Sequence, residues 1–290
     1  MKISRILCPT DFSETSAHAV DLAVAIAGHY KAAISGLHVV QTIEPSVDAG
    51  SVDGLRHEAA AFFDKATRAG VSVDVQVELG SPVHWILDRA ANLPADLVVM
   101  GTHGSSGFEH LMLGSVTEKV LRKAPCPVLT VPPRARSRSR LPFHHLLCAT
   151  DFSEASSLAV RFALSLAVES DACLTLLHVL EWPWHEPPQP SLDELPAEQG
   201  FALAMFRREL EVRARRQLEE LVPRTGPSIR VAVVSGTPYE QVLASAAAES
   251  ADLIVLGVGR RSALNLALLG STASHVIRAA ECPVLTLRGR

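Results

Sequence analysis

One stretch occurs twice in this chain of 290 residues, first as Cys8-Pro9-Thr10-Asp11-Phe12-Ser13-Glu14 and again as Cys148-Ala149-Thr150-Asp151-Phe152-Ser153-Glu154. The second copy follows the first by 140 positions (8 to 148). A shorter stretch, Leu37-His38-Val39, returns at the same displacement as Leu177-His178-Val179. A repeat of this length is the size of a domain, so it indicates a duplicated domain rather than a solenoid of short repeats.

The two copies differ in length and are separated by a distinct linker. Near their ends, the run Cys126-Pro127-Val128-Leu129-Thr130 returns 156 positions later (126 to 282), so the second copy holds 16 additional residues (156 against 140). We expect this insertion in the proline-rich stretch at 182–200. Residues 134–140 alternate arginine with small residues and cannot bury an apolar face, which indicates a solvated linker. The predicted divisions are 1–133, 134–142 and 143–290.

Each copy alternates short apolar runs with stretches of helical periodicity. In the first copy we expect strands at 3–8, 33–40, 71–77, 96–100 and 127–131, and helices at 14–29, 55–69, from 82 onward, and 115–123. Ser13 and Ser81 stand where they can cap the first and third of these helices. The alternation predicts an α/β fold of two tandem Rossmann-like domains, each a five-stranded parallel sheet with helices on both faces.

The overall composition excludes several classes of protein. Hydrophobic residues make up 48%, charged residues make up 20%, and the formal net charge is −4. These values suit a soluble globular protein and give no basic footprint for nucleic acid. No apolar run approaches the roughly 20 residues that span a bilayer, and no signal-peptide pattern follows Met1. We therefore expect a cytoplasmic protein without nucleic-acid or membrane partners.

The five cysteines form no Cys-x-x-Cys pair. We expect all of them to be small buried apolar groups in a reducing compartment. A zinc site is the alternative, but the spacing of zinc ligands is missing, so no metal ligand is assigned. The cysteines stand at positions 8, 126, 148, 173 and 282.

A glycine-containing loop follows the fourth expected strand. It reads Gly101-Thr102-His103-Gly104, and after nine further residues Gly114-Ser115 opens a helix. Glycines allow the backbone to approach a ligand closely, and the first N–H groups of a helix have no partner inside it, so this loop suits a phosphate. No Gly-Lys-Ser/Thr element occurs, and no G-x-G-x-x-G follows the first strand, which excludes a P-loop and disfavours a dinucleotide dehydrogenase.

This loop, the Pro-Thr-Asp-Phe-Ser motif and the terminal Cys-Pro-Val-Leu-Thr strand together resemble the universal stress protein family. The resemblance covers both halves and implies a tandem member with adenine nucleotide alpha hydrolase-like domains that binds ATP, with or without Mg²⁺. It implies that Asp11 contacts the nucleoside, Val39 meets adenine through its backbone, and the loop and helix start hold the phosphates. The implied nucleotide-binding residues are Pro9, Thr10, Asp11, Val39, Met100, Gly101, His103, Gly104, Gly114, Ser115, Val116 and Thr117.

Two of these residues also have a simpler interpretation. Asp11 can merely support the cap of the first helix, and its recurrence as Asp151 does not decide between the two roles. His103 is a structural loop residue, a phosphate contact or a general acid. His38 and His178 follow apolar runs and are expected to be satisfied core groups.

The second copy departs from the loop pattern, because Arg260 stands where its second glycine is expected. Either an arginine supplies positive charge to a phosphate, or the site is degenerate and empty. The candidate residues of this second site are Asp151, Val179, Gly257, Arg260, Gly270, Ser271 and Thr272.

Three functions remain open from the sequence. The first is a regulatory ATP-binding module of the stress response, which acts through unidentified protein partners. The second is a slow ATP hydrolase or other nucleotide enzyme, and the third is an interaction protein with vestigial sites. No catalytic residue is assigned, because the first loop has no Lys or Arg to clamp a phosphate. The terminal strands at 127–131 and 283–287 are expected to join the two halves, and the resemblance also implies a homodimer.

Overall fold

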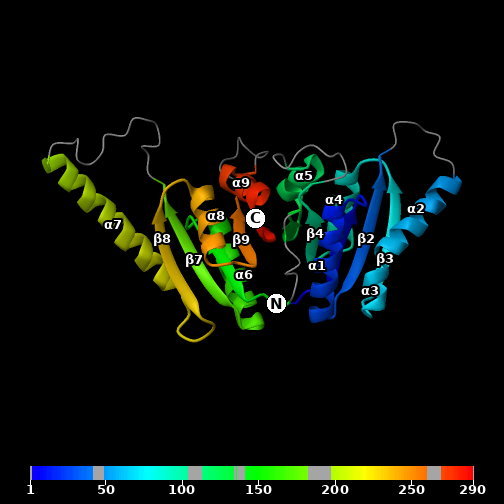
Figure 1. Ribbon diagram of the computed structural model, residues 1–290, viewed down its shortest axis with the longest axis horizontal. Coiled ribbons are helices and arrows are strands. Elements are labelled where there is room, and N and C mark those ends of the chain that lie inside the picture. The colour runs from blue at the N-terminus through cyan, green and yellow to red at the C-terminus, as the bar shows by residue number, and fades with distance from the viewer. Residues whose placement is uncertain are drawn as a thin grey trace.

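The computed structural model describes residues 2–41, 49–103, 113–133, 135, 141–181, 197–259 and 269–289 (Figure 1). The elements of the first half are β1 (Arg5–Thr10), α1 (Glu14–Tyr30), β2 (Ala33–Val40), α2 (Ala49–Phe62), α3 (Asp64–Arg68), β3 (Val73–Leu79), α4 (Pro82–Asn92), β4 (Leu97–Gly101), α5 (Ser115–Lys123) and β5 (Val128–Val131). The elements of the second half are β6 (His145–Ala149), α6 (Glu154–Ser170), β7 (Cys173–Leu180), α7 (Ala197–Leu221), β8 (Ile229–Ser235), α8 (Pro238–Ala248), β9 (Leu253–Val258), α9 (Ser271–Ala279) and β10 (Val284–Arg288).

The strands within the described residues form one ten-stranded sheet in the order β3-β2-β1-β4-β5-β10-β9-β6-β7-β8. Neighbouring strands are parallel within each half, and the halves meet where β5 pairs with β10 antiparallel. There Thr130 lies opposite Val284 and Val128 lies opposite Thr286. The predicted α/β fold and the predicted joining of the two terminal strands are both confirmed.

Two apolar layers cover the two faces of the sheet. One contains Leu22 of α1 and Leu218 of α7, and the other contains Val120 of α5 and Val276 of α9. Each layer holds residues of both β5 and β10, namely Val131 with Leu287 on one face and Val128 with Val284 on the other. The hydrophobic core is therefore continuous from one half to the other.

The helix starts follow from the capping residues expected from the sequence. Ser13 accepts a hydrogen bond from the Ser16 N–H at 3.2 Å, and Ser153 accepts one from the Ser156 N–H at 3.2 Å. Ser81 caps α4 by accepting from the His84 N–H at 3.4 Å, with Pro82 at the first helical position, where its missing N–H is not needed. These caps fix where the loops after β1, β6 and β3 end.

Several element boundaries differ from the sequence prediction, two of them with consequences for the fold. The first strand runs to Thr10 rather than to residue 8, so Pro9 and Thr10 are its last residues. The expected helix at 55–69 begins earlier, at Ala49, and is interrupted at Phe63. Phe63 is 1% exposed, and its ring occupies the space beside Gly36, where a Cβ would lie only 2.7 Å away. The break therefore coincides with a ring that is buried against β2.

The insertion and the linker lie partly outside the described residues. The second strand is displaced by 140 positions (33 to 173) and the third by 156 (73 to 229), so the additional residues fall between β7 and β8, as expected. Of the expected insertion, 182–196 lies outside the described part, whereas residues 197–200 belong to α7. Of the linker, 134 and 136–140 lie outside it as well.

The cysteines are not all buried, which corrects the expectation from the sequence. Cys8 and Cys148 are fully buried, and burial raises the pKa of each thiol to about 12. Cys126 and Cys282 are half-buried, and Cys173 is exposed, because it is the first residue of β7 at the rim of the sheet. Within the described ranges, no group of three or more His, Cys, Asp or Glu side chains could hold a metal ion.

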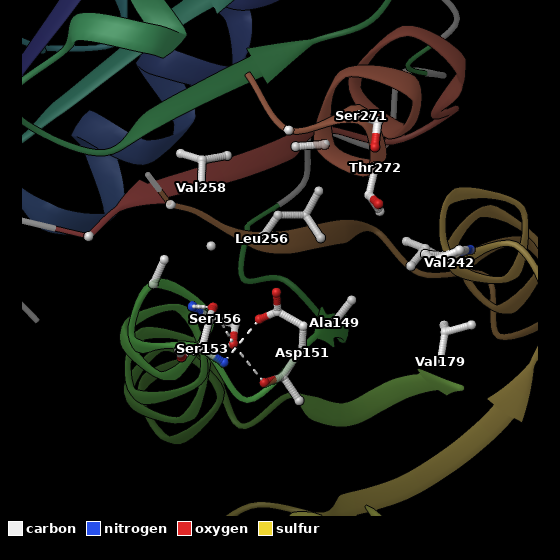
Figure 2. Close-up of a pocket in the computed structure, with 18 of the residues that line it drawn as sticks. Ala149, Asp151, Ser153, Ser156, Val179, Val242, Leu256, Val258, Ser271 and Thr272 are labelled. Atoms are coloured by element: carbon white, nitrogen blue, oxygen red, sulfur yellow. Dashed lines mark hydrogen bonds between the residues drawn. The ribbon is translucent and has the colours of Figure 1, made fainter. Parts of the chain in front are cut away.

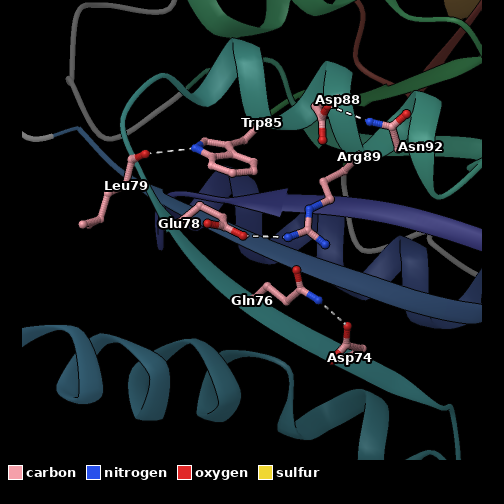
Figure 3. Close-up of polar contacts among 8 residues, drawn as sticks. All are labelled: Asp74, Gln76, Glu78, Leu79, Trp85, Asp88, Arg89 and Asn92. Atoms are coloured by element: carbon pink, nitrogen blue, oxygen red, sulfur yellow. Dashed lines mark hydrogen bonds and ion pairs between the residues drawn. The ribbon is translucent and has the colours of Figure 1, made fainter. Parts of the chain in front are cut away.

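The sheet edge at β3 carries a network of polar side chains (Figure 3). Glu78 of β3 forms an ion pair of 2.6 Å with Arg89 of α4, and the Trp85 indole N–H donates to the Leu79 carbonyl oxygen at 2.9 Å. The positions equivalent to Glu78 and Arg89, displaced by 156, are Val234 and Ser245 in the second half. The two halves therefore share a fold but differ in the chemistry of this face.

Across the described helices, none is long and apolar enough to cross a membrane.

We predict that removing either buried threonine hydroxyl at the junction weakens the whole molecule. Thr130 donates to the Val284 carbonyl oxygen and Thr286 donates to the Val128 carbonyl oxygen, each at 3.1 Å. Thr130→Val and Thr286→Val should each lower the free energy of unfolding by about 1 kcal/mol in urea titrations, because each leaves a buried carbonyl with one fewer donor. Thr67→Val on the exposed surface of α3 is the control and should change it by less than about 0.5 kcal/mol. Equal effects at Thr67 and Thr130 would contradict this prediction.

Candidate functional site

A cavity of about 220 Å³ lies in the first half, where the carboxyl ends of β1, β2 and β4 meet the start of α5. Ligands in parallel α/β sheets gather at this end of the strands. Eleven of the twelve residues expected at the nucleotide site line this cavity, and the twelfth, Gly104, lies outside the described residues. The lining residues among them are Pro9, Thr10, Asp11, Val39, Met100, Gly101, His103, Gly114, Ser115, Val116 and Thr117.

The cavity combines an apolar floor with polar groups at its margins. Leu37, Ile86 and Met100 line it and are at most 5% exposed. Asp11 lies at one margin, and the exposed Ser115 lies at another, at the first position of α5. Such a site suits a flat apolar ring that carries a polar tail.

The loop after β1 is held by a set of local interactions that place Asp11. The Thr10 hydroxyl oxygen accepts from the Phe12 N–H at 3.0 Å, and Phe12 has a φ of 62°, which is uncommon for a residue other than glycine. The Phe12 ring stacks on His38 with centroids 4.1 Å apart, and His38 Nδ1 donates to the Thr10 carbonyl oxygen at 2.9 Å. His38 is therefore satisfied, as expected, but sequence reasoning missed the stack with Phe12. The recurrence of both residues, as Phe152 and His178, was the signal for it.

Asp11 has the capping role that the sequence left open, and it also lines the cavity. Its Oδ1 accepts from the Ser13 hydroxyl at 2.6 Å and from the Ser13 N–H at 3.2 Å. Because Ser13 caps α1, the Asp11 carboxylate is fixed to the helix start. The two interpretations of Asp11 are compatible.

The loop that follows β4 returns to the strand end through Gly114 and Thr117. The Gly114 N–H donates to the Thr102 carbonyl oxygen, and the Thr117 hydroxyl donates to the Gly101 carbonyl oxygen, both at 2.9 Å. Thr117 gives its hydroxyl hydrogen to the backbone and so supports the loop, while its oxygen can still accept a hydrogen bond at the cavity. His103 Nδ1 lies 2.8 Å from the Thr102 hydroxyl oxygen, which ties the imidazole to the same loop.

An equivalent cavity of about 310 Å³ lies in the second half (Figure 2). Asp151 and Ser153 lie on one side of it, and Ser271 and Thr272 lie on the other. Every candidate of the second site lines this cavity except Arg260, which lies outside the described residues; those lining it are Asp151, Val179, Gly257, Gly270, Ser271 and Thr272.

The loop that carries Asp151 repeats the construction seen at Asp11. The Ser153 N–H donates to Asp151 Oδ1 at 3.0 Å, and His178 Nδ1 donates to the Thr150 carbonyl oxygen at 2.8 Å. Burial acts to raise the pKa of Asp151, but hydrogen bonds from the side chains of Ser153 and Ser156 and from backbone amides hold this pKa below its ordinary value. Asp151 is therefore a carboxylate at neutral pH.

Comparison with known proteins gives matches over both halves. The model of the universal stress protein family matches residues 2–132 and 142–288. A universal stress protein from Mycolicibacterium smegmatis is 27% identical over 307 aligned positions, which cover 98% of this chain and 97% of the relative. A universal stress protein from Methanocaldococcus jannaschii is 33% identical over 138 residues, which cover 44% of this chain and 81% of the relative.

A solved structure shows the same fold over the full length. The crystal structure of a universal stress protein from Archaeoglobus fulgidus superposes with a TM-score of 0.72, covering 99% of this chain and 97% of that chain. The sequence identity is 24%, so this likeness establishes the architecture only.

We predict that the glycines at the ends of β4 and β9 differ in their tolerance of a side chain. A Cβ at Gly257 would lie 2.3 Å from the Ala155 carbonyl oxygen, which is backbone of α6, whereas a Cβ at Gly101 would lie 2.8 Å from the Thr15 methyl group. Gly101→Ala should therefore cost about 1–3 kcal/mol of unfolding free energy, and Gly257→Ala should cost more, because a backbone cannot rotate away.

Thermal and urea unfolding followed by circular dichroism measures both variants. Gly28→Ala in α1 is the control, since a Cβ there meets no atom within 4 Å and alanine favours the helix by about 0.5–1 kcal/mol. If Gly257→Ala were as stable as Gly101→Ala, the prediction would be wrong, and the backbone of α6 would have moved to make room for the methyl group.

Proposed function

Because this chain belongs to the universal stress protein family, with one match in each half, we propose that it binds ATP in the cavity of its first half as a regulatory module. The observation that carries the proposal is the convergence of β1, β2, β4 and α5 on one cavity, with an apolar floor and the start of a helix at its margin. This arrangement meets the separate needs of a base, a ribose and a phosphate tail.

In the proposed complex, each part of the nucleotide lies against groups of matching chemistry. The adenine ring packs on the apolar side chains Leu37 and Ile86, and the backbone of Val39 recognises its edge. Asp11 accepts hydrogen bonds from ribose hydroxyls, since a carboxylate is an acceptor. The phosphates lie at the start of α5, where the first N–H groups and the positive end of the helix dipole attract an anion. Any Mg²⁺ would enter together with the phosphates.

The described lining of this cavity supports a binding protein over an enzyme. Its ionisable side chains are Asp11 and His103, and among these described lining residues there is no Lys or Arg. Phosphoryl transfer relies on positive groups or metal ions that stabilise charge on the transferred group. We therefore propose that occupancy by ATP, rather than its turnover, is the signal passed to protein partners.

The homodimer implied by the resemblance also stays a proposal. Within this chain, β5 and β10 already pair with each other, so this edge of each half is used internally. A second chain would have to use another surface.

We predict that two substitutions in the first cavity weaken ATP binding, measured by titration calorimetry on the full chain. Val116→Trp fills the cavity and should abolish binding at this site. Asp11→Asn keeps an acceptor for the Ser13 cap but removes the charge, and should weaken binding roughly tenfold or more, as expected for a hydrogen bond to a charged group. The matched controls are Thr272→Trp and Asp151→Asn in the second cavity, which should leave this affinity unchanged.

Two results would overturn the proposal. The first is a folded wild-type protein that binds no ATP, or binds it with the same affinity after Val116→Trp. The second is multiple-turnover hydrolysis of ATP that Asp11→Asn abolishes, because this result would establish the enzyme instead of the binding module.

A further inference from the structure

The two cavities are built from equivalent elements but carry different charge. In the first, Asp11 is the one carboxylate among the described lining residues. In the second, Asp151, Glu154 and Glu181 line the cavity, but Glu154 has its counterpart in Glu14 at the start of α1, so Glu181 is the carboxylate that the first half lacks. Glu181 follows β7 and occupies the position that Gln41 occupies after β2, 140 positions earlier. The second cavity therefore carries one additional carboxylate, at the carboxyl end of β7.

The helix end of the second cavity has also lost polar groups. His103 and Thr117 are replaced at the equivalent positions, 156 later, by Gly259 and Ala273. Ala273 cannot make the hydroxyl bond that Thr117 makes to the strand-end carbonyl, so the loop after β9 lacks this support. Thr272, in place of Val116, adds a hydroxyl on the cavity wall.

These differences change which ligand the cavity favours. Carboxylates repel the several negative charges of a triphosphate, and because Asp151, Glu154 and Glu181 are exposed to solvent, salt screens this repulsion. A nucleoside carries no charge and brings hydroxyl and amino hydrogens, which carboxylates accept. Asp151 retains its charge at neutral pH, because its hydrogen bonds hold its pKa low.

We infer that the second cavity binds an uncharged nucleoside in preference to a nucleoside triphosphate, and that Glu181 is the residue that sets this preference. The inference rests on the proposed function for the contacts of the base and the ribose. The cavity of about 310 Å³ has the size of a small-ligand site and keeps an apolar wall of Leu177, Val179 and Val242. The chain would then hold a triphosphate site and a nucleoside site on one sheet.

The experiment uses adenosine and ATP as probes and calorimetry on the full chain. In a Val116→Trp background, which fills the first cavity, adenosine should bind at one site and ATP should bind at least about tenfold more weakly. Adding Glu181→Gln should reduce the ratio of adenosine affinity to ATP affinity roughly three- to tenfold, because ATP binding becomes stronger. The preference should also shrink as the salt concentration rises, since salt screens charge repulsion.

The reciprocal exchange is the matched control. In a Thr272→Trp background, which fills the second cavity, Gln41→Glu should weaken ATP binding to the first cavity by a similar factor and leave adenosine binding nearly unchanged. Adding Thr272→Trp to the Val116→Trp protein should remove adenosine binding. Loss in this double variant with retention in Val116→Trp places the nucleoside in the second cavity.

Several results overturn the inference while the proposed function stands. These are an absence of adenosine binding in the Val116→Trp protein, an ATP affinity there equal to or above that of adenosine, and a ratio that Glu181→Gln leaves unchanged. Arg260 lies outside the described residues. If it held the phosphates of ATP in the second cavity, the Val116→Trp protein would bind ATP at least as tightly as adenosine, and Arg260→Ala would remove this ATP binding. Wild-type ATP binding that Val116→Trp leaves intact would instead contradict the proposed function.

Discussion

The antiparallel pairing of β5 with β10 is the interaction on which the whole architecture depends. It turns two five-stranded parallel arrays into one ten-stranded sheet, and it lets the apolar layer on each face continue across the junction. Thr130 and Thr286 reinforce the pairing, because each donates a buried hydroxyl to a carbonyl on the opposite strand. Both cavities lie on elements of this single sheet.

Much of this fold could be predicted from local sequence signals. Ser13 and Ser81 begin helices because a serine hydroxyl satisfies a free N–H at a helix start, and α5 has the bounds that its periodicity predicts. The interruption at Phe63 could not be predicted, because periodicity does not show that this ring packs beside Gly36 of β2, far away in the sequence. Cys173 was expected to be buried, but its exposure depends on where β7 begins, and strand ends are the least certain feature of a sequence pattern.

The candidate site shows the same division between local and long-range information. The motifs identified residues that the fold brings together around one cavity, since the carboxyl ends of β1, β2 and β4 must meet at one edge of a parallel sheet. The stack of Phe12 on His38 joins residues far apart in the sequence and needed the fold to be recognised. The alignment of the two copies shows Gln41 opposite Glu181. Only the structure shows that both residues line equivalent cavities, where the difference in charge can affect a ligand.

The continuity of the two apolar layers has a thermodynamic consequence. Since each layer contains side chains from both halves, separating β5 from β10 would expose apolar residues of both halves at once. A molecule that binds only the native state adds its binding free energy to the stability of everything that unfolds together with its site. If the chain unfolds as one unit, a ligand bound in either cavity would therefore stabilise both halves. Two different ligands, one in each cavity, would then add their binding free energies to the same unfolding transition.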